Sequence, residues 1–283
     1  MIKLDMQNYK NVIPLIKTAD INTMFALSVL EGKVEGKVYI DDEASPNSFY
    51  IQHPYGMVLL YGETNKEDFY VQLTSHMLNL ENVRSKFEWL QVYPASLYSK
   101  IDTILGNNLI KKKLNEPYEQ SYLPEEDKKV LEYQRINFVF NKEKFIEFKK
   151  SLVTRNYRVV TTSEVIFNQL DGSVIPKHFW NNSSDFMNNG IGYTLLLDND
   201  FPASTAFSSS FIDDKLEIGI ETHSKNHGMG FGAYVCAKLI DYCIEYGYEP
   251  VWSCNSGNIG SRKLAHRLGF EEFKRVPYYR LSK

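Results

Sequence analysis

The sequence predicts an α/β fold (α+β, with mixed sheets), in which a smaller first domain precedes a second domain that carries the chemistry. Short apolar runs typical of strands alternate with segments of helical periodicity along the chain. A polar, proline-containing segment at about residues 111–129 separates two stretches that each hold several such elements. We therefore predict two domains, residues 1–128 and residues 129–283.

Charge and composition exclude several classes of protein. The 283 residues include 32 Lys and Arg against 35 Asp and Glu, and this balance lacks the cationic excess expected for binding a nucleic-acid backbone. No stretch approaches the roughly 20 apolar residues of a membrane span, and we see no signal peptide. Three cysteines, Cys236, Cys243 and Cys254, do not make a disulfide framework. We expect a cytoplasmic protein with no nucleic-acid or membrane partner.

The first domain is predicted to be a mixed α/β unit. Residues 21–31 and 69–80 have the apolar spacing of helices. Residues 38–40, 48–51 and 57–61 are short apolar runs, and a turn with both proline and glycine separates the last two. These runs predict several neighbouring strands.

The second domain shows a clearer alternation of strands and helices. Asn141 is a suitable N-cap for its first helix, and Gly247 and Gly269 end its later helices. Asp213 and Asp214 predict a hairpin turn. The predicted helices are residues 142–152, 230–246 and 258–268, and the predicted strands are residues 193–197, 203–211, 216–222, 251–254 and 273–281.

The strongest local signal is a glycine-rich loop between a strand and a helix. Gly228, Gly230 and Gly232 alternate along the chain just before the helix at residues 230–246. Glycine lets the backbone come close to a ligand, and a helix start offers unpaired N–H groups and a positive dipole end. Together these features predict a phosphate or pyrophosphate site. A purely structural tight turn is the alternative reading.

Two other phosphate-binding patterns fit less well. A nucleoside-triphosphate loop needs a Lys-Ser/Thr pair after its last glycine, and nothing after Gly232 supplies one. Gly228, Gly230 and Ala233 satisfy a dinucleotide-binding pattern, but five residues separate them from the preceding strand. The strand that follows also lacks the acidic residue that this pattern requires at its end.

A second motif lies one helix and one strand further on. Residues 225–230 resemble the pyrophosphate loop of the GNAT family of acetyl-CoA-dependent N-acetyltransferases, with Lys225 in place of the usual Gln or Arg. Residues 258–270 resemble the Asn-containing helix of the same family. The resemblance covers about residues 138–281 and comes closest to the branch that contains the zwittermicin A resistance acetyltransferase. It implies a GNAT acyltransferase fold. Residues 29–32 and 36–42 separately resemble the degenerate GNAT-like half that precedes many such domains.

The resemblance also implies a site and a co-substrate. Acetyl-CoA would lie between the strands at residues 216–222 and 251–254, and no metal is expected. Strand alternation separates Glu221 from its aliphatic neighbours, which makes it our candidate general base. A salt-bridged carboxylate is the alternative role for Glu221. The residues implied to bind the cofactor are Ile220, Glu221, Thr222, Lys225, Asn226, His227, Gly228, Met229, Gly230, Phe231, Gly232, Asn255, Asn258 and Ser261.

One residue departs from the family pattern. Ala265 stands where many members have a Tyr that protonates the leaving thiolate. His266, His223 and Tyr279 are the alternative acids, and an acyl-enzyme on Cys254 is a minor alternative route.

The sequence thus predicts transfer of an acetyl group to a primary amine of a small molecule, such as an antibiotic or metabolite. A non-catalytic acyl-CoA sensor or scaffold, and a peptide or protein N-acetyltransferase, are the alternatives. A homodimer is compatible with the sequence.

Overall fold

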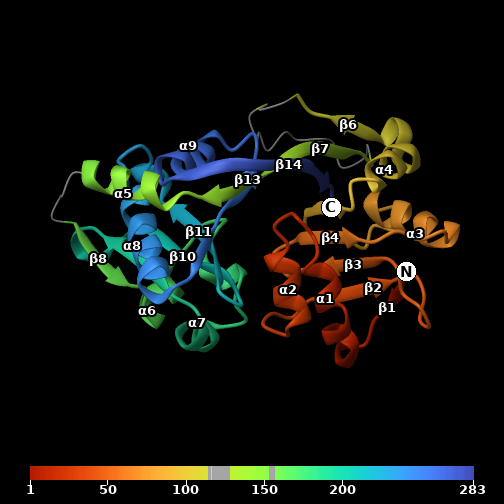
Figure 1. Ribbon diagram of the computed structural model, residues 1–283, viewed down its shortest axis with the longest axis horizontal. Helices are drawn as coiled ribbons and strands as arrows, with labels where there is room; N and C mark the ends of the chain where they lie inside the picture. Colours follow the sequence, from red (N-terminus) through yellow and green to blue (C-terminus); the bar gives the residue numbers. More distant parts are fainter. Residues whose placement is uncertain (114–115, 117–127, 153–156) are drawn as a thin grey trace. The chain divides into compact units, whose positions relative to one another are not determined.

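The computed structural model describes residues 1–113, 116, 128–152 and 157–283 (Figure 1). The chain forms two compact units: unit 1 comprises residues 1–137, 253–259 and 274–283, and unit 2 comprises residues 138–252 and 260–273. The domain boundary predicted between residues 128 and 129 stays a prediction, because most of the segment before it lies outside the described residues.

Unit 1 is built on a sheet in the order β1-β2-β3-β4-β5-β14-β7-β13, with β6 paired to β7. β1 to β4 form antiparallel pairs, and β4 and β5 are parallel. β7 and β14 are long strands that contribute residues to both units. The strands are β1 (Ile2–Lys3), β2 (Lys37–Ile40), β3 (Phe49–Gln52), β4 (Met57–Tyr61), β5 (Glu88–Tyr93), β6 (Leu109–Lys111), β7 (Val130–Phe140), β13 (Ser253–Asn255) and β14 (Phe270–Leu281).

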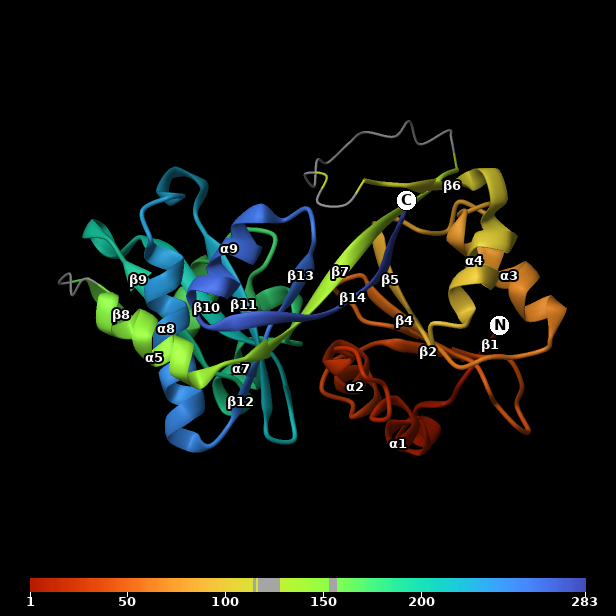
Figure 2. The same cartoon turned by 45° about the horizontal axis from the view of Figure 1, so that its top comes forward.

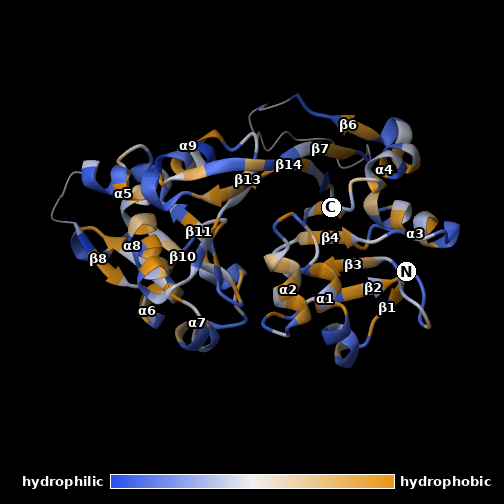
Figure 3. Cartoon of the chain, viewed as in Figure 1, coloured by the Kyte–Doolittle hydropathy of each residue, from blue (hydrophilic) through white to orange (hydrophobic). Residues whose placement is uncertain are grey.

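Helices lie on both sides of β2–β5 in unit 1. Helices α1 (Ile13–Ile16) and α2 (Met24–Leu30) lie on one side, and α3 (Glu67–Met77) and α4 (Leu97–Leu105) lie on the other (Figure 2). Residues of α3 and α4 form one core with alternate residues of β4 and β5. Hydrophobic residues fill α2 and strands β2–β4 (Figure 3), as burial from two sides requires.

Unit 2 holds a second sheet in the order β12-β11-β10-β9-β8. Its strands are β8 (Arg158–Thr161), β9 (Gly192–Leu196), β10 (Pro202–Ile212), β11 (Lys215–Thr222) and β12 (Glu249–Val251). Its helices are α5 (Lys142–Ser151), α6 (Glu164–Gln169), α7 (Ser183–Asn189), α8 (Phe231–Tyr246) and α9 (Ile259–Arg267), of which α9 begins in unit 1. α8 packs on β9, β10 and β11.

Local chemistry explains where the helices of unit 2 begin and end. The Asn141 side chain accepts a hydrogen bond from the Lys144 N–H at 3.1 Å, which confirms it as the N-cap of α5. The side chains of Ser163 and Asn182 cap α6 and α7 in the same way. α8 ends at Gly247, whose φ of 78° lies in the left-handed region that glycine tolerates.

The two units share one sequence of elements but differ at one pair of strands. In each unit, three strands follow one another and pair antiparallel with their neighbours. A helix then leads to a fourth strand, which is parallel to the third. The two orders are β2-β3-β4-α3-β5 and β9-β10-β11-α8-β12. β4 pairs with β5 along its whole length, from Met57 to Tyr61. β11 pairs with β12 only from Lys215 to Glu217 and continues to Thr222. In unit 2, the end of β11 therefore has no strand partner among the described residues on the edge that faces β12.

One predicted strand is corrected by the structure. Residues 251–254 were expected to form a single strand, but Trp252 lies between β12, which pairs with β11, and β13, which pairs with β7. The strand therefore changes sheets at this point. The Trp252 indole N–H donates to the Ser261 hydroxyl at 3.1 Å, and its ring packs on Phe270.

Candidate active site

The two faces of β11 differ as strand alternation predicts. On one face, Ile220 and Thr222 approach Gly232 at the start of α8. On the other face, the ring of Phe207 lies so close to Gly219 that a Cβ there would meet it at 2.5 Å. The close approach requires glycine at this position. The aliphatic face of the strand is therefore the helix-packed face, and Glu221 lies on the other face, as strand alternation predicts.

The two glycines of the loop lie in open surroundings. Gly228 and Gly230 have φ values of 79° and 82°, and a Cβ at either position would point into open space. The space around the loop is thus free while the backbone is in a conformation that other residues adopt only at a cost. Glycine is favoured at these two positions by the positive φ of the backbone and not by a lack of space for a side chain.

The N–H groups beside these glycines fit an anion. In the described part of the chain, the amides of Gly228, Gly230, Phe231 and Gly232 donate no recorded hydrogen bond. α8 has 16 residues and no acidic residue in its first turn, so its dipole is not offset there. A helix start with free amides and no acidic residue is a suitable position for an anion such as phosphate. By contrast, Glu67 and Asp68 occupy the first turn of α3 in unit 1.

The side chains of the loop have separate tasks. Lys225 is exposed, and no ion pair is recorded for it within the described ranges. The Asn226 side chain is buried and contacts the Met229 sulfur at 3.6 Å. The His227 Nε2–H donates to the Thr222 carbonyl at 2.7 Å, so its hydrogen bond joins the loop to the end of β11. Lys225 is therefore an exposed cation of this loop, and its role toward an anion stays a prediction.

The unpaired edge of β11 displays backbone groups of alternate residues. The His223 N–H donates to Ala203 of β10, and the Glu221 carbonyl accepts from the Ser204 hydroxyl of β10. Because backbone groups point to alternate sides along a strand, those of Ile220 and Thr222 point to the opposite, unpaired edge. An extended amide-containing ligand could pair there like an added strand. The main chain of Glu221 instead faces β10.

The remaining predicted cofactor residues lie near the end of β13 and in α9. The Asn255 Oδ1 accepts from the Gly257 N–H at 2.8 Å, and its Nδ2 is buried without a recorded partner among the described residues. The N–H of Asn258, which is exposed, donates to the Asn255 carbonyl at 2.9 Å. The Ser261 hydroxyl accepts the Trp252 indole N–H, as described above.

Glu221 is held by a neighbouring loop. Its Oε2 accepts hydrogen bonds from the Val174 N–H at 2.7 Å and from the Ser173 hydroxyl at 3.2 Å. With Asp171, His223 and Phe201 it lines a cavity of about 210 Å³. These bonds give the carboxylate a structural task, and its predicted role as general base stays a prediction.

A second carboxylate on the same face was not singled out from the sequence. Glu217 is buried, and it is the last residue of β11 that pairs with β12. The Phe207 ring over Gly219 lies between Glu217 and Glu221 along the strand. Strand alternation already places Glu217 and Glu221 on one face of β11. The point where β11 stops pairing with β12 depends on the tertiary structure, and the periodicity of the sequence does not reveal it.

The candidate acids for a leaving thiolate differ in placement. Tyr279 is fully buried in the core of unit 1, and burial raises the pKa of its hydroxyl well above the usual range. His266 is exposed, with its Nε2 3.4 Å from Glu272. His223 lines the cavity with Glu221, and its Nδ1 accepts from the Lys225 N–H. The core position of Tyr279 excludes it as a donor in the structure described.

The cysteines are buried. Cys236 and Cys243 lie on the buried face of α8, as the helical spacing predicted, and burial raises the pKa of Cys243 to about 12. Cys254 is also buried. Within the described ranges, no three His, Cys, Asp or Glu side chains gather as a metal site needs. No helix there is long and apolar enough to cross a membrane.

The parted strands and the glycine-rich helix start together define an acyltransferase of the GNAT type. The family model for GNAT acetyltransferase matches residues 14–279, and the chain therefore belongs to this family, which uses acetyl-CoA. The chain is similar to the uncharacterized N-acetyltransferase YdfB of Bacillus subtilis (strain 168), with 26% identity over 256 residues that cover 90% of this chain and 89% of YdfB.

Solved structures show the same fold. A GCN5-related N-acetyltransferase-like protein from Streptococcus suis 89/1591 has a TM-score of 0.67 at 18% identity, covering 97% of this chain and 99% of that one. A tandem GNAT protein from the clavulanic acid biosynthesis pathway has a TM-score of 0.59 at 7% identity, covering 99% and 97%. The tandem neighbour agrees with the repeated order of elements in the two units.

Proposed function

We propose that this acetyltransferase transfers the acetyl group of acetyl-CoA to a primary amine of a small molecule. The proposal depends on two features that occur together in the described residues. Backbone amides at the start of α8, here called the cradle, have no recorded hydrogen-bond partner, and the end of β11 has an edge without a strand partner. The cradle suits a pyrophosphate and the edge suits an extended amide chain. These are the two parts of coenzyme A that a binding site must hold.

Acetyl-CoA, when bound, supplies an acetyl thioester. The amides of Gly228, Gly230, Phe231 and Gly232 would hold its pyrophosphate, and the Lys225 ammonium would add a local cation. The backbone of Ile220 and the N–H of Thr222 would pair with the amide arm. No large positive surface is needed, which agrees with the nearly balanced charge of the chain.

The acceptor amine must lose a proton to attack. The nitrogen forms a bond to the acetyl carbon, the carbon–sulfur bond breaks, one amine proton passes to a base, and the thiolate gains a proton. A carboxylate, directly or through water, is a suitable base. We place this role on Glu217, because the arm would extend from the α8 cradle toward the point where the strands part.

Glu221 is the second candidate for the base. A strand rises about 3.3 Å per residue, so Glu221 lies about 13 Å from Glu217, toward the glycine loop. Its carboxylate also holds the loop at Ser173 and Val174. We therefore assign Glu221 a positioning role, and the two variants tested below separate the candidates.

The likeness to the branch with the zwittermicin A resistance acetyltransferase supports an amino-containing antibiotic or metabolite as acceptor. Thiol release from acetyl-CoA, measured over a panel of small amines, amino-containing antibiotics and lysine peptides, tests this choice. We expect turnover with at least one small amine and none with the peptides. Tight acetyl-CoA binding without transfer to any amine would contradict the proposal.

A further inference from the structure

The loop that holds Glu221 contains the one Asp-Gly pair of the sequence, Asp171-Gly172. An aspartate followed by glycine can react with its own backbone, because glycine has no Cβ to obstruct the approach of its amide nitrogen to the preceding carboxyl group. The reaction needs a backbone N–H that is free of hydrogen bonds and a carboxyl group that can turn toward it. Both conditions are met in this loop.

Asp171 and Gly172 lie between anchored residues. Before them, the Leu170 carbonyl accepts a hydrogen bond from a lysine ammonium at 3.1 Å, and after them, the Val174 N–H donates to Glu221 at 2.7 Å. In the described ranges, neither the Gly172 N–H nor the Asp171 carboxylate has a recorded partner. Both residues are exposed and lie outside helices and strands. The pair is therefore the part of this loop that is free to change conformation.

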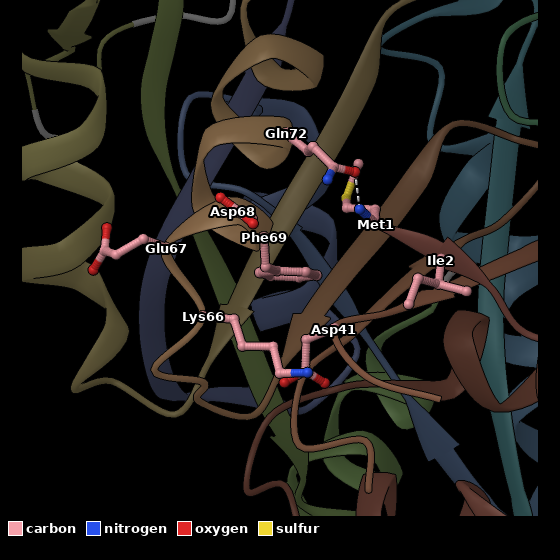
Figure 4. A pocket seen from close by; sticks show the side chains of 8 residues that line it. All are labelled: Met1, Ile2, Asp41, Lys66, Glu67, Asp68, Phe69 and Gln72. Atoms are coloured by element: carbon pink, nitrogen blue, oxygen red, sulfur yellow. Dashed lines mark hydrogen bonds between the residues drawn. The ribbon is translucent and has the colours of Figure 1, made fainter. Parts of the chain in front are cut away.

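Asp41 in unit 1 shows the opposite arrangement. It lines a cavity of about 510 Å³ beside the start of α3 (Figure 4), and it is 7% exposed. Its Oδ1 accepts hydrogen bonds from the N–H groups of Asn47 at 2.9 Å and Ser48 at 3.0 Å. These bonds fix the carboxyl group, so it does not turn toward the backbone nitrogen that follows it.

The one Asn-Gly pair of the sequence, Asn189-Gly190, is held by the fold. In an unfolded chain, Asn-Gly forms the same cyclic imide faster than Asp-Gly, because a neutral amide is attacked more readily than an ionised carboxylate. Asn189 is the last residue of α7, however, and the Gly190 N–H donates to the Phe186 carbonyl at 2.9 Å. A Cβ at Gly190 would also meet the Phe186 ring at 2.6 Å. The fold therefore blocks the more reactive pair and leaves the less reactive pair open.

We propose that Asp171 converts spontaneously to isoaspartate in the folded protein. The Gly172 nitrogen forms a bond to the Asp171 Cγ, and its proton leaves with one carboxyl oxygen as water, the second proton coming from solvent. Water then breaks the bond between this nitrogen and the backbone carbonyl carbon of Asp171. That carbon becomes a carboxylate, the borrowed proton returns to solvent, and the mass of the chain is unchanged.

The product changes the support of Glu221. The main chain at residue 171 now runs through the side-chain carbon and is longer. A Cβ on Gly172 would meet the Glu221 Cγ at 2.7 Å, so there is no room for the added length on that side. The change therefore displaces Ser173 and Val174, whose hydroxyl and N–H hold the Glu221 carboxylate. This consequence for acetyl transfer rests on the proposed function, whereas the isomerisation itself does not.

The test is prolonged incubation of the full chain at neutral pH, followed by proteolysis and peptide mass spectrometry. Methyl transfer from S-adenosylmethionine by an L-isoaspartyl methyltransferase detects isoaspartate, and a change in mass detects deamidation of Asn189. We expect isoaspartate at residue 171 to accumulate roughly tenfold faster or more than deamidation at Asn189, because Asn189 must first open locally. In guanidinium chloride the order of the two sites should reverse.

Asp171→Glu is the matched control, because its longer side chain would have to close a larger and less favourable ring. The variant should accept no methyl group at this position. Absence of isoaspartate at residue 171, or the same order of the two sites in folded and denatured protein, overturns the proposal. The comparison of the two sites uses the wild type alone, so it does not depend on the folding of a variant.

Acetyl-transfer kinetics measure the consequence separately. The aged wild type should have a KM for the amine about two- to tenfold above that of the fresh protein, the size expected when hydrogen bonds to one carboxylate are lost. Aged Asp171→Glu should match its own fresh sample, and repair of the aged wild type by the methyltransferase should restore the KM. Isoaspartate formed without a change in KM would confirm the isomerisation and contradict the positioning role of Glu221.

Discussion

Glu217 and Val251 are the last residues that pair β11 with β12. Beyond them β11 stays paired with β10 alone, and the chain after β12 continues into β13, which pairs with β7. The corresponding pair in unit 1, β4 and β5, stays joined through Tyr61 and Tyr93. The same order of elements therefore forms an open strand edge in unit 2 and a closed ladder in unit 1. We infer that acetyl transfer belongs to unit 2, and the predictions below test its parts.

The first prediction concerns the backbone of the loop. Gly230→Ala places a Cβ on a residue with a φ of 82°, which costs roughly 1–2 kcal/mol in free energy of unfolding. Any relaxation of that strain moves the amides of the cradle, so the affinity for acetyl-CoA should fall about 5- to 30-fold. Gly247→Ala is the matched control, because Gly247 has a φ of 78° at the other end of α8. Denaturation should show similar losses, and calorimetry should show weaker cofactor binding only for Gly230→Ala.

The second prediction concerns the cation of the loop. Lys225→Ala should weaken acetyl-CoA binding about two- to fivefold at low salt, since an exposed charge interaction is worth about 0.2–1 kcal/mol. The difference should shrink as ionic strength rises, because salt screens exposed charges. Lys238→Ala removes an exposed lysine of α8 away from its start and should leave binding unchanged. A loss that is independent of salt would refute a point-charge role for Lys225.

The third prediction concerns Glu88 in unit 1. Burial alone raises the pKa of its carboxyl, but the hydrogen bond from His76, the charges of His76 and Arg84, and the bond from Tyr50 outweigh burial and lower it. A carboxyl with a depressed folded pKa stabilises the fold above its unfolded pKa, and this contribution is lost as pH falls through the folded pKa. We expect the free energy of unfolding to decline below about pH 4.5.

Glu88→Gln provides the check on this pH dependence. The variant breaks a buried charged cluster and should cost about 3–5 kcal/mol at pH 7. Its free energy of unfolding should depend less on pH between 7 and 3 than that of the wild type. Urea denaturation at several pH values measures both effects. An unchanged slope in Glu88→Gln would show that other groups govern the acid sensitivity.

Sequence patterns predicted the local features of the site better than its tertiary ones. The glycine loop, the caps at Asn141 and Gly247 and the two faces of β11 depend on neighbours in the chain, and each is found as expected. The switch of sheets at Trp252 depends on a distant strand, β7, and was predicted as one continuous strand. β7 itself gave no clear alternation, because its residues from Val130 onward are largely buried on both faces.

The importance of Glu217 was missed for the same reason. The Glu at position 221 stands beside the recognisable loop, whereas position 217 gains its interest only where the ladder with β12 ends. Likewise, the bonds from Ser173 and Val174 to Glu221 join residues 47 or more positions apart, and no local pattern signals them.

The central claim is that a carboxylate of β11 near the parting of the strands takes the proton of an acceptor amine. Its most direct test is the pH dependence of acetyl-transfer kcat, with acetyl-CoA affinity measured in parallel, for Glu217→Gln and Glu221→Gln. We predict that Glu217→Gln lowers kcat by about 10²- to 10⁴-fold, removes the fall of kcat on the acidic side of its pH profile and leaves cofactor affinity within twofold. Glu221→Gln should mainly raise the KM for the amine. Normal turnover in Glu217→Gln, with loss of turnover in Glu221→Gln, would contradict this assignment and return the role to Glu221.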